Sequence, residues 1–387
     1  MESSGADKCA DWDSAERVEL RRTVRGFTER HVLPNLDEWE KDGEVPRSVH
    51  RVAGKLGLLA AGFPENVGGV GDMIDNLVIT DELISAGASS GFAAALLTHH
   101  IALPHIVASG DEYLIERYVL PSISGEMIGC LGVTEPTGGS DVAGLATKAE
   151  DHGDHWLING SKTYITSGAR ADFIVVAAST DGAGHAGVSL IVVDTSSAGF
   201  SVTRRLEKMG WACSDTAEIS LVDVEVPKAN LVGERGTGFY QIMRNFDGER
   251  LGLAVHGYAL ASRSLELAVE WARTRRSSGA PLTSLQTIRH KLAEMARQTE
   301  VARVFTQKVA TDFAAGRVGS KEVAMAKNTS VYACDYVVDQ ALQIHGGLGY
   351  MKGSEVERIY RDARILGIGG GTNEIMNEII AKRMALV

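Results

Sequence analysis

The sequence predicts an α+β protein in which a sheet domain lies between two helical domains. The hydrophobic spacing is helical from about residue 13 to 127, alternates as in strands from about 128 to 234, and becomes helical again from about 236. The 387 residues allow two or three domains at roughly 150 residues each. We therefore expect a helical N-terminal domain over 1–127, a β domain over 128–234 and a helical bundle over 235–387.

The first helical signal lies in ERVELRRTVRGFTERHVLPNLDEWE, where Val18, Leu20 or Arg21, Val24 and Phe27 recur at helical spacing. The middle segment is strand-like: HWLI and SKTYIT flank Asn159-Gly160, which predicts a hairpin turn at these two residues. FIVVAAS and VSLIVVD flank a loop containing DGAGHAG, and FSVTRRL and AEISLVDVEV alternate in the same way. A compact sheet or barrel is expected.

The C-terminal part opens with ERLGLAVHGYALASRSLELAVEWARTRR, which predicts a long amphipathic helix. Its expected apolar face comprises Leu251, Val255, Tyr258, Ser262, Leu265, Ala268 and Trp271. Near the end of the chain, GIGGGTNEIM (367–376) places three glycines before a helical pattern. Glycine tolerates φ > 0 and Thr372 or Asn373 can cap a helix, so these residues predict a turn that leads into a helix.

The composition argues against nucleic acid or an anionic membrane as a partner. The 50 Asp and Glu residues outnumber the 39 Lys and Arg residues, for a formal net charge of -11. Any anionic ligand must then be held by a local basic site. Cys9, Cys130, Cys213 and Cys334 are far apart and form no C-x-x-C pair, so neither a disulfide framework nor a zinc site is expected.

The charged N-terminus lacks the apolar core of a signal peptide, and we find no run of about 18 uninterrupted apolar residues that would span a membrane. We therefore expect a cytoplasmic protein. His99, His100 and His105 lie in the apolar stretch LLTHHIALPHIV without an acidic partner at helical spacing. They are expected to line the core or a pocket, and no metal site is predicted.

Several motifs carry the functional signal. VTEPTGGSDV (133–142) is rich in backbone N–H groups and hydroxyls, so it is either a polar ligand site or a capped connecting turn. Together with YITSGA (164–169), RTRRSSG (273–279), LQTIRHKLAEM (285–295), QIHGGLGY (343–350) and GGGTNEI (369–375), its order and spacing resemble those of the acyl-CoA dehydrogenase family over nearly the whole chain. The resemblance implies a helical N-terminal domain, a β-barrel-like middle domain and a C-terminal four-helix bundle.

The resemblance also implies the chemistry. In that family, FAD lies between the β domain and the C-terminal helices, with an acyl-CoA thioester against the flavin. A carboxylate removes a proton from Cα while a hydride leaves Cβ for flavin N5, and the product is a trans-2-enoyl-CoA. Many members carry the catalytic glutamate directly before the Gly-Thr of the last motif, where this chain has Gly370.

A subset that includes the long-chain and isovaleryl-type enzymes instead places the base at the start of the first long C-terminal helix. The matching residue here is Glu249 in NFDGERLGLA, which we predict to be the base. The alternative is a first-turn glutamate that follows an Asp247 cap and is favoured by the helix dipole. Such a setting would lower its pKa, whereas burial by a bound acyl chain would raise it.

Gly370 is predicted to donate its backbone N–H to the thioester oxygen, a role that needs no side chain. Glycine at 369 and 370 removes bulk beside the α and β carbons, because many relatives have an aromatic residue at the first position. This widened pocket favours a long or branched acyl chain.

The remaining matches to the family concern FAD and substrate contacts. Tyr164 replaces a common tryptophan, Ser278 a frequent phenylalanine and Glu374 a frequent glutamine. The predicted substrate-side residues are Ser140, Asp247 and Arg250. The residues that match flavin contacts are Leu131, Val133, Thr134, Tyr164 and Thr166, and those that match FAD contacts across a subunit interface are Arg275, Gln286, Gln343 and Gly347. Thr372 and Glu374 match the pair that closes over the cofactor.

Three functional hypotheses follow. The first is an FAD-dependent acyl-CoA dehydrogenase that forms a homotetramer, as a dimer of dimers, and passes electrons to an electron-transfer flavoprotein. The second is an oxidase-like flavoenzyme whose flavin is reoxidised by oxygen. The third, motivated by Gly370, is a flavin-binding family member that no longer dehydrogenates.

Overall fold

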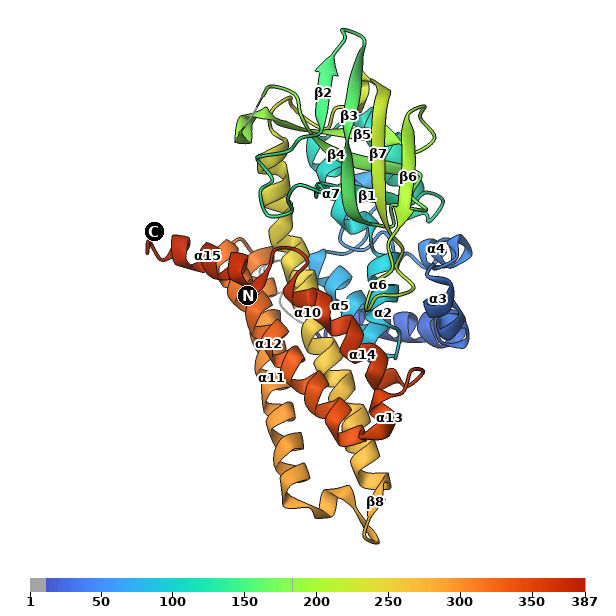
Figure 1. Ribbon diagram of the computed structural model, residues 1–387, viewed down its shortest axis with the longest axis vertical. Helices are drawn as coiled ribbons and strands as arrows, with labels where there is room; N and C mark the ends of the chain where they lie inside the picture. Colours follow the sequence, from blue (N-terminus) through green and yellow to red (C-terminus); the bar gives the residue numbers. More distant parts are fainter. Residues whose placement is uncertain (1–11, 183, 387) are drawn as a thin grey trace, which may run out of the picture.

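The computed structural model describes residues 12–182 and 184–386. Cys9 and the rest of residues 1–11, which include the start of the charged N-terminus, lie outside the described residues. Helices are followed by a sheet and then by helices again, with the sheet at one end of an elongated molecule (Figure 1). The predicted α+β class, with a sheet domain between two helical domains, is confirmed.

The N-terminal part is built from short helices. Their first turns carry side-chain caps at several points: Ser14 accepts from the backbone N–H of Arg17, and Asp72 and Asp75 form a reciprocal capping box. The helices are α2 (Ala15–Phe27), α3 (Leu36–Asp42), α4 (Arg47–Lys55), α5 (Met73–Ser85), α6 (Ser90–Leu96), α7 (His99–Ser109), α8 (Glu112–Leu114) and α9 (Leu120–Ile123).

The middle part is a curled seven-stranded sheet with the order β1-β4-β2-β3-β7-β6, in which β5 pairs with β4 off this path. One face packs against the N-terminal helices, where the rings of Tyr118 and Phe173 lie 4.7 Å apart. The strands are β1 (Gly129–Gly132), β2 (Lys148–Asp151), β3 (His155–Thr166), β4 (Phe173–Ser179), β5 (Val188–Asp194), β6 (Phe200–Arg205) and β7 (Thr216–Pro227). The strands predicted on either side of DGAGHAG are confirmed as β4 and β5, and the structure pairs them antiparallel.

The prediction of a hairpin turn at Asn159-Gly160 is wrong. Both residues lie inside the single strand β3, which pairs with β7 through an irregularity at this point. Asn159 and Asp223 exchange two hydrogen bonds of 2.9 and 2.8 Å across the irregularity, and Asp223 has a φ of 51°. A Cβ on Gly160 would lie 2.4 Å from Oγ1 of Thr147, so this glycine serves a close approach within the sheet rather than a turn.

The C-terminal part is organised around α10 (Gly238–Thr274), a helix of 37 residues that runs from the sheet along the length of the bundle (Figure 1). It packs against α11 (Gln286–Ala314), α12 (Ser320–His345) and α5. The hairpin strands β8 (Arg276–Ser277) and β9 (Ala280–Pro281) close its far end, and α13 (Gly347–Tyr350), α14 (Glu355–Ala363) and α15 (Asn373–Arg383) complete the chain. Leu251, Val255, Tyr258 and Ala268 of the predicted apolar face are buried.

The apolar stretch Ser90–Ser109 is long and hydrophobic enough to cross a membrane by composition alone. Two thirds of it, 67%, is buried inside the protein, as in a core helix. His99 and His100 within it bond to the backbone carbonyls of Leu59 and Ala61 at 2.8 and 2.9 Å. Burial lowers the pKa of His99 to about 4, so it is a neutral core residue.

Candidate functional site

The triple glycine forms a left-handed turn between a short 3-10 segment (Arg364–Gly367) and α15. Gly370 and Gly371 have φ values of 64° and 94°, and Thr372 caps α15 by accepting from the N–H of Ile375. The positive φ values and the cap agree with the sequence prediction. A Cβ on Gly370 would lie 2.5 Å from Cδ1 of Leu253, so the turn sits directly against α10.

Two buried cations hold the carbonyl groups of this turn. Lys327 on α12 donates from Nζ to the carbonyls of Gly369, at 2.6 Å, and Gly371. Arg250 donates from Nε to the carbonyl of Gly370 at 3.3 Å. With all three carbonyls engaged, the N–H of Gly370 has no acceptor among the described residues, so it is available to an incoming ligand.

Lys327 was missed by the sequence reasoning. It is fully buried, and burial together with the positive charge of Arg250 lowers its pKa to about 8. A signal was present, because Lys327 lies four residues from both Val323 and Val331 on the apolar face of its helix. A lysine at such a position is rarely buried without a specific partner.

Glu249 lies on the same helix as Arg250, about three turns inside α10. The prediction that Glu249 lies at the start of this helix is wrong, because α10 begins at Gly238 and continues through Gly248. The side chain is half-buried, and its Oε1 is sealed from solvent without a hydrogen-bond partner in the described part of the chain. Burial raises the pKa of this carboxyl to about 8, opposed by the charge of Arg250.

Asp247, two residues earlier, has the opposite environment. It is buried and accepts from Arg250 at 2.9 Å and from the hydroxyl of Ser320 at 2.7 Å. The interpretation of Asp247 as a helix cap is wrong, because the residue lies within α10. Of the two neighbouring carboxylates, Asp247 is therefore paired through both oxygens, whereas Glu249 has no hydrogen-bond partner among the described residues.

The predicted substrate residue Ser140 does not join this cluster. It is exposed on the loop after β1, where no hydrogen bond links it to Asp247 or Arg250 in the described chain. Glu135 joins the start of that loop to its end, because it accepts from the backbone N–H groups of Ala146 and Thr147. It also accepts from the buried Nζ of Lys162 at 2.7 Å.

A second group of predicted residues meets in the β domain. The N–H of Thr163 donates to the carbonyl of Thr134 at 2.9 Å, which joins the segment containing Leu131, Val133 and Thr134 to the end of β3. Tyr164, in β3, has a φ of 59° and is 69% exposed. A large exposed ring held in a disfavoured backbone conformation presents a stacking surface, as an isoalloxazine would need.

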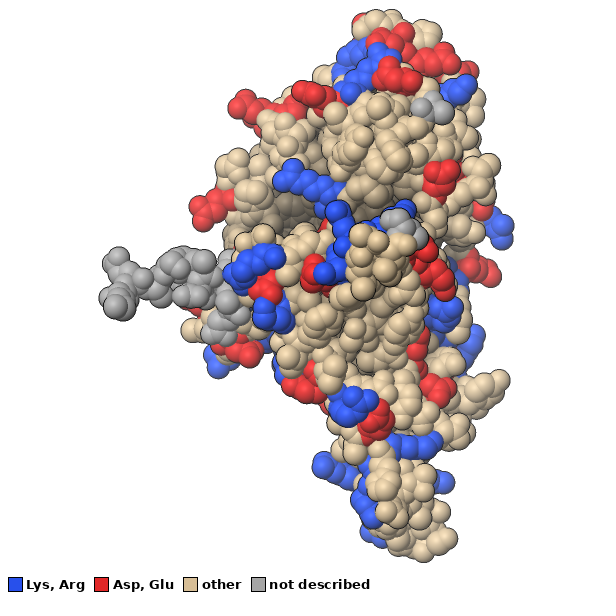
Figure 2. All heavy atoms as spheres, turned by 90° about the vertical axis from the view of Figure 1, so that its left-hand side faces the viewer, with Lys and Arg blue, Asp and Glu red and all other residues tan. Residues whose placement is uncertain are grey.

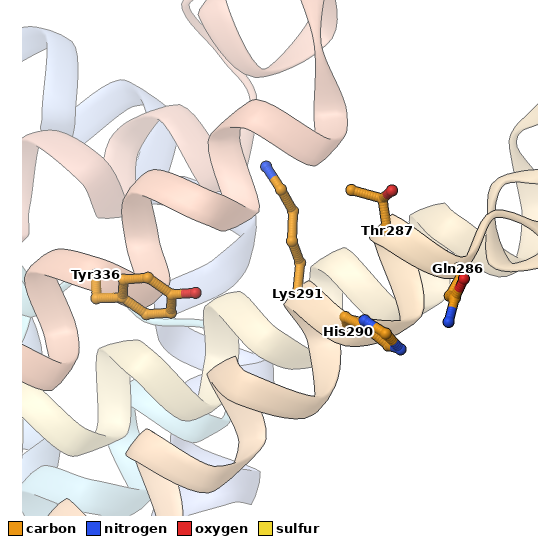
Figure 3. Close-up of a pocket in the computed structure, with 5 residues that line it drawn as sticks. All are labelled: Gln286, Thr287, His290, Lys291 and Tyr336. Atoms are coloured by element: carbon orange, nitrogen blue, oxygen red, sulfur yellow. The ribbon is translucent and has the colours of Figure 1, made fainter.

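A third group lies at the far end of the bundle, away from the sheet (Figure 1). Arg275 at the end of α10 lies over the ring of Trp271, and Gln286 begins α11. A hollow of about 390 Å³ there is lined by Gln286, Thr287, His290, Lys291 and Tyr336. Figure 3 shows the hydroxyl of Tyr336 directed toward the side chains from α11.

One chain therefore does not bring Arg275, Gln286, Gln343 and Gly347 to the β-domain group, and a shared cofactor site would need a second subunit.

Thr372 and Glu374 line another hollow, of about 540 Å³, between α12, α14 and the start of α15. Figure 2 shows Lys and Arg side chains around the hollowed boundary between the β domain and the bundle. Local basic groups are thus present at this boundary of a protein with net negative charge.

The comparisons with known proteins cover the whole described architecture. Family models for the N-terminal, middle and C-terminal domains of acyl-CoA dehydrogenases match residues 14–126, 130–224 and 236–385. The chain is 36% identical to the mitochondrial long-chain specific acyl-CoA dehydrogenase of Rattus norvegicus, over 96% of this chain and 87% of that protein. It is 38% identical to the short-chain specific enzyme of the same species, over 94% of this chain and 88% of that protein.

Solved structures show the same relationship. The crystal structure of a probable acyl CoA dehydrogenase from Mycobacterium abscessus has 59% identity and a TM-score of 0.96, over 97% of this chain and 100% of that one. An acyl-CoA dehydrogenase from Bacillus anthracis complexed with FAD has 31% identity and a TM-score of 0.89, over 96% of this chain and 67% of that one.

Proposed function

The chain belongs to the acyl-CoA dehydrogenase family, and from this premise we propose that it dehydrogenates an acyl-CoA thioester between Cα and Cβ with Glu249 as the base. The family membership makes the protein an FAD-dependent oxidoreductase that acts on acyl-CoA. The identity of the base, the donors around it and the kind of acyl chain are our inference.

The observation that carries the proposal is the unpaired carboxylate of Glu249. A base for a thioester α-proton works best with a pKa near the working pH, and burial raises the pKa of Glu249 to about 8 before any substrate binds. Arg250 beside it is committed to Asp247 and to the carbonyl of Gly370. The proton of Cα would therefore pass to the carboxylate of Glu249, which has no hydrogen-bond partner among the described residues and whose Oε2 is not sealed from solvent.

The charge that develops on the thioester oxygen needs a donor. The N–H of Gly370 is available for this, because its own turn is anchored through the carbonyls by Lys327 and Arg250. A donor preorganised in this way costs no rearrangement at the moment of reaction. Gly370 would thus bind and polarise the carbonyl while Glu249 removes the proton.

The β-domain group fits an FAD isoalloxazine, with Tyr164 as an open stacking ring and Leu131, Val133, Thr134 and Thr166 beside it. The Gln286 hollow and Arg275 fit the cofactor's anionic half from a second subunit, since an Arg fork suits a diphosphate. When bound, FAD supplies the hydride acceptor. In this arrangement the chain's own residues bind and orient the cofactor, and we propose a homotetramer that brings the two groups together.

We further propose a long or branched acyl chain, an electron-transfer flavoprotein as electron acceptor, and a cytoplasmic location. The chain-length proposal rests on Gly369, where an added Cβ would meet no atom nearer than 3.6 Å, whereas Leu253 already occupies the place of a side chain at Gly370. The relatives include both long-chain and short-chain enzymes, so overall similarity does not select between them.

The test is turnover of acyl-CoA with an artificial electron acceptor by wild type, Glu249→Gln and Asp247→Asn. Loss of the base is expected to lower kcat by about 10³-fold or more in Glu249→Gln, with acyl-CoA binding retained. Asp247→Asn keeps a carbonyl oxygen that can accept from Arg250, so its kcat should fall less than that of Glu249→Gln. Unchanged turnover in Glu249→Gln would refute the assignment, and peroxide formed in air at the turnover rate would favour the oxidase-like alternative.

A further inference from the structure

A buried polar relay lies where the three domains meet, and the reaction described above does not use it. Trp211, in the loop between β6 and β7, donates from Nε1 to Oγ of Ser90 on α6 at 2.9 Å. Ser90 Oγ in turn lies 2.7 Å from Nδ1 of His256 on α10. Ser90 is fully buried and His256 is 7% exposed.

The relay fixes which nitrogen of His256 carries the proton. An indole N–H can only donate, so Ser90 accepts from Trp211. The hydroxyl proton of Ser90 then has one available acceptor, Nδ1 of His256, and any other assignment would leave a buried hydroxyl unpaired. Burial lowers the pKa of His256 to about 4, so the neutral ring carries its single proton on Nε2.

The Nε2–H group of His256 has no hydrogen-bond partner within the described part of the chain. Nε2 of His256 is accessible to solvent, whereas Nε2 of His105 is sealed from solvent and has no hydrogen-bond partner in the described chain. His256 therefore presents an unpaired donor to accessible space from a residue that is otherwise buried. A donor in such a place is satisfied by water or by a polar atom of a bound ligand.

The position of His256 relates this donor to the proposed base. Glu249, Gly252 and His256 lie at i, i+3 and i+7 on α10, so they share one face of the helix. Helix geometry places His256 about 10 Å along the axis from Glu249. A Cβ built on Gly252, between them, meets no atom within 4 Å, so this face is open at the position between the base and the histidine.

We propose that this open face is the distal acyl pocket and that its substrate carries a hydrogen-bond acceptor, a carbonyl or hydroxyl oxygen, which binds Nε2–H of His256. The substrate class is then an oxygen-substituted acyl-CoA rather than a plain alkanoyl-CoA. The inference rests on the proposed function, because it places Cα at Glu249. Ser90 acts through His256 as a positioning residue that holds the tautomer.

The experiment uses a series of acyl-CoA thioesters of one chain length, with a keto group at successive distal carbons and the unsubstituted chain as reference. Dissociation constants from flavin spectral perturbation and anaerobic bleaching rates are measured for wild type, His256→Leu and Ser90→Ala. His105→Leu is the matched control, because His105 is also buried and its pKa is likewise lowered to about 4, but its Nε2 is sealed from solvent.

Wild type should prefer one keto position over the unsubstituted chain by about ten-fold, as expected for one neutral hydrogen bond. The preference should disappear in His256→Leu, weaken in Ser90→Ala and persist in His105→Leu. If His256→Leu fails to fold, His256→Asn, which keeps a shorter donor, should show a reduced preference. Equal binding of every member by wild type, or a preference that survives in His256→Leu, would overturn this inference while leaving the dehydrogenase intact. No bleaching by any member would overturn the proposed function and this inference with it.

Discussion

Replacing Glu249 by Gln is expected to stabilise the protein at alkaline pH, and the size of the effect follows from the carboxyl group's environment. Burial raises its pKa from 4.5 to about 8. The folded chain therefore binds more protons than the unfolded chain between these two values, and the free energy of unfolding falls as pH rises through this window. Below pH 4 or so the contribution is fully present, and above about 8 it is lost.

The difference between a pKa of 4.5 and one of about 8 corresponds to roughly 5 kcal/mol. We expect roughly 3–5 kcal/mol, because part of the Glu249 side chain remains accessible to water. Glutamine has nearly the same shape and no charge to bury. The variant should thus equal wild type near pH 4 to 5 and be more stable by this amount near pH 9.

The assay is urea unfolding of wild type and Glu249→Gln at several pH values, with midpoints compared at equal protein concentration. Glu234→Gln, which alters an exposed carboxylate just before α10, is the control and should stay within about 0.5 kcal/mol of wild type throughout. A stability difference for Glu249→Gln that does not change between acidic and alkaline pH would refute the claim that this carboxyl is buried and unpaired.

Four further results are expected. In wild type, kcat/KM should rise with pH to a plateau above an apparent pKa near 8, and a pH-independent profile would contradict the role of Glu249 as base. Gly370→Ala should lower the unfolding free energy by about 1–2 kcal/mol, seen as a lower thermal midpoint, because its φ of 64° is left-handed and its Cβ would meet Leu253; an unchanged midpoint would count against this. Lys327→Met should lower kcat about ten- to hundred-fold by freeing the glycine turn, whereas Lys308→Met on the surface should not. Tyr164→Ala should weaken FAD retention on dilution about ten-fold without destabilising the β domain, and equal retention with the Tyr113→Ala control would contradict the stacking role.

The domain order and the glycine turn were predictable because local patterns determine them. Hydrophobic periodicity distinguishes helix from strand without tertiary information, and three consecutive glycines before Thr372 specify a positive-φ turn and a cap. Asn159-Gly160 shows the limit of such local reasoning. The same dipeptide that favours a two-residue turn also tolerates an irregularity inside a long strand, and the approach of Thr147 decides between them.

The site was predictable in its residue types but less so in its connections. Glu249 was identified by its place in a motif, yet its helix begins eleven residues earlier than expected because GFYQIMRNF continues the same helical pattern. The contacts of Lys327 with the glycine turn join positions more than forty residues apart, and the relay through Ser90, Trp211 and His256 joins three domains. Spacing along the sequence carries no record of such contacts.

The most direct test of the central claim is anaerobic bleaching of the flavin absorbance by a panel of short, long, branched and oxygen-substituted acyl-CoAs, with wild type and Glu249→Gln compared. Glu249 is the carboxylate in this cluster that the protein leaves unpaired, so wild type should be bleached rapidly by one class of acyl-CoA. Glu249→Gln should bind the same thioester without bleaching. Bleaching of both proteins at the same rate would mean that another group removes the α-proton, and the assignment made from the unpaired carboxylate would be wrong.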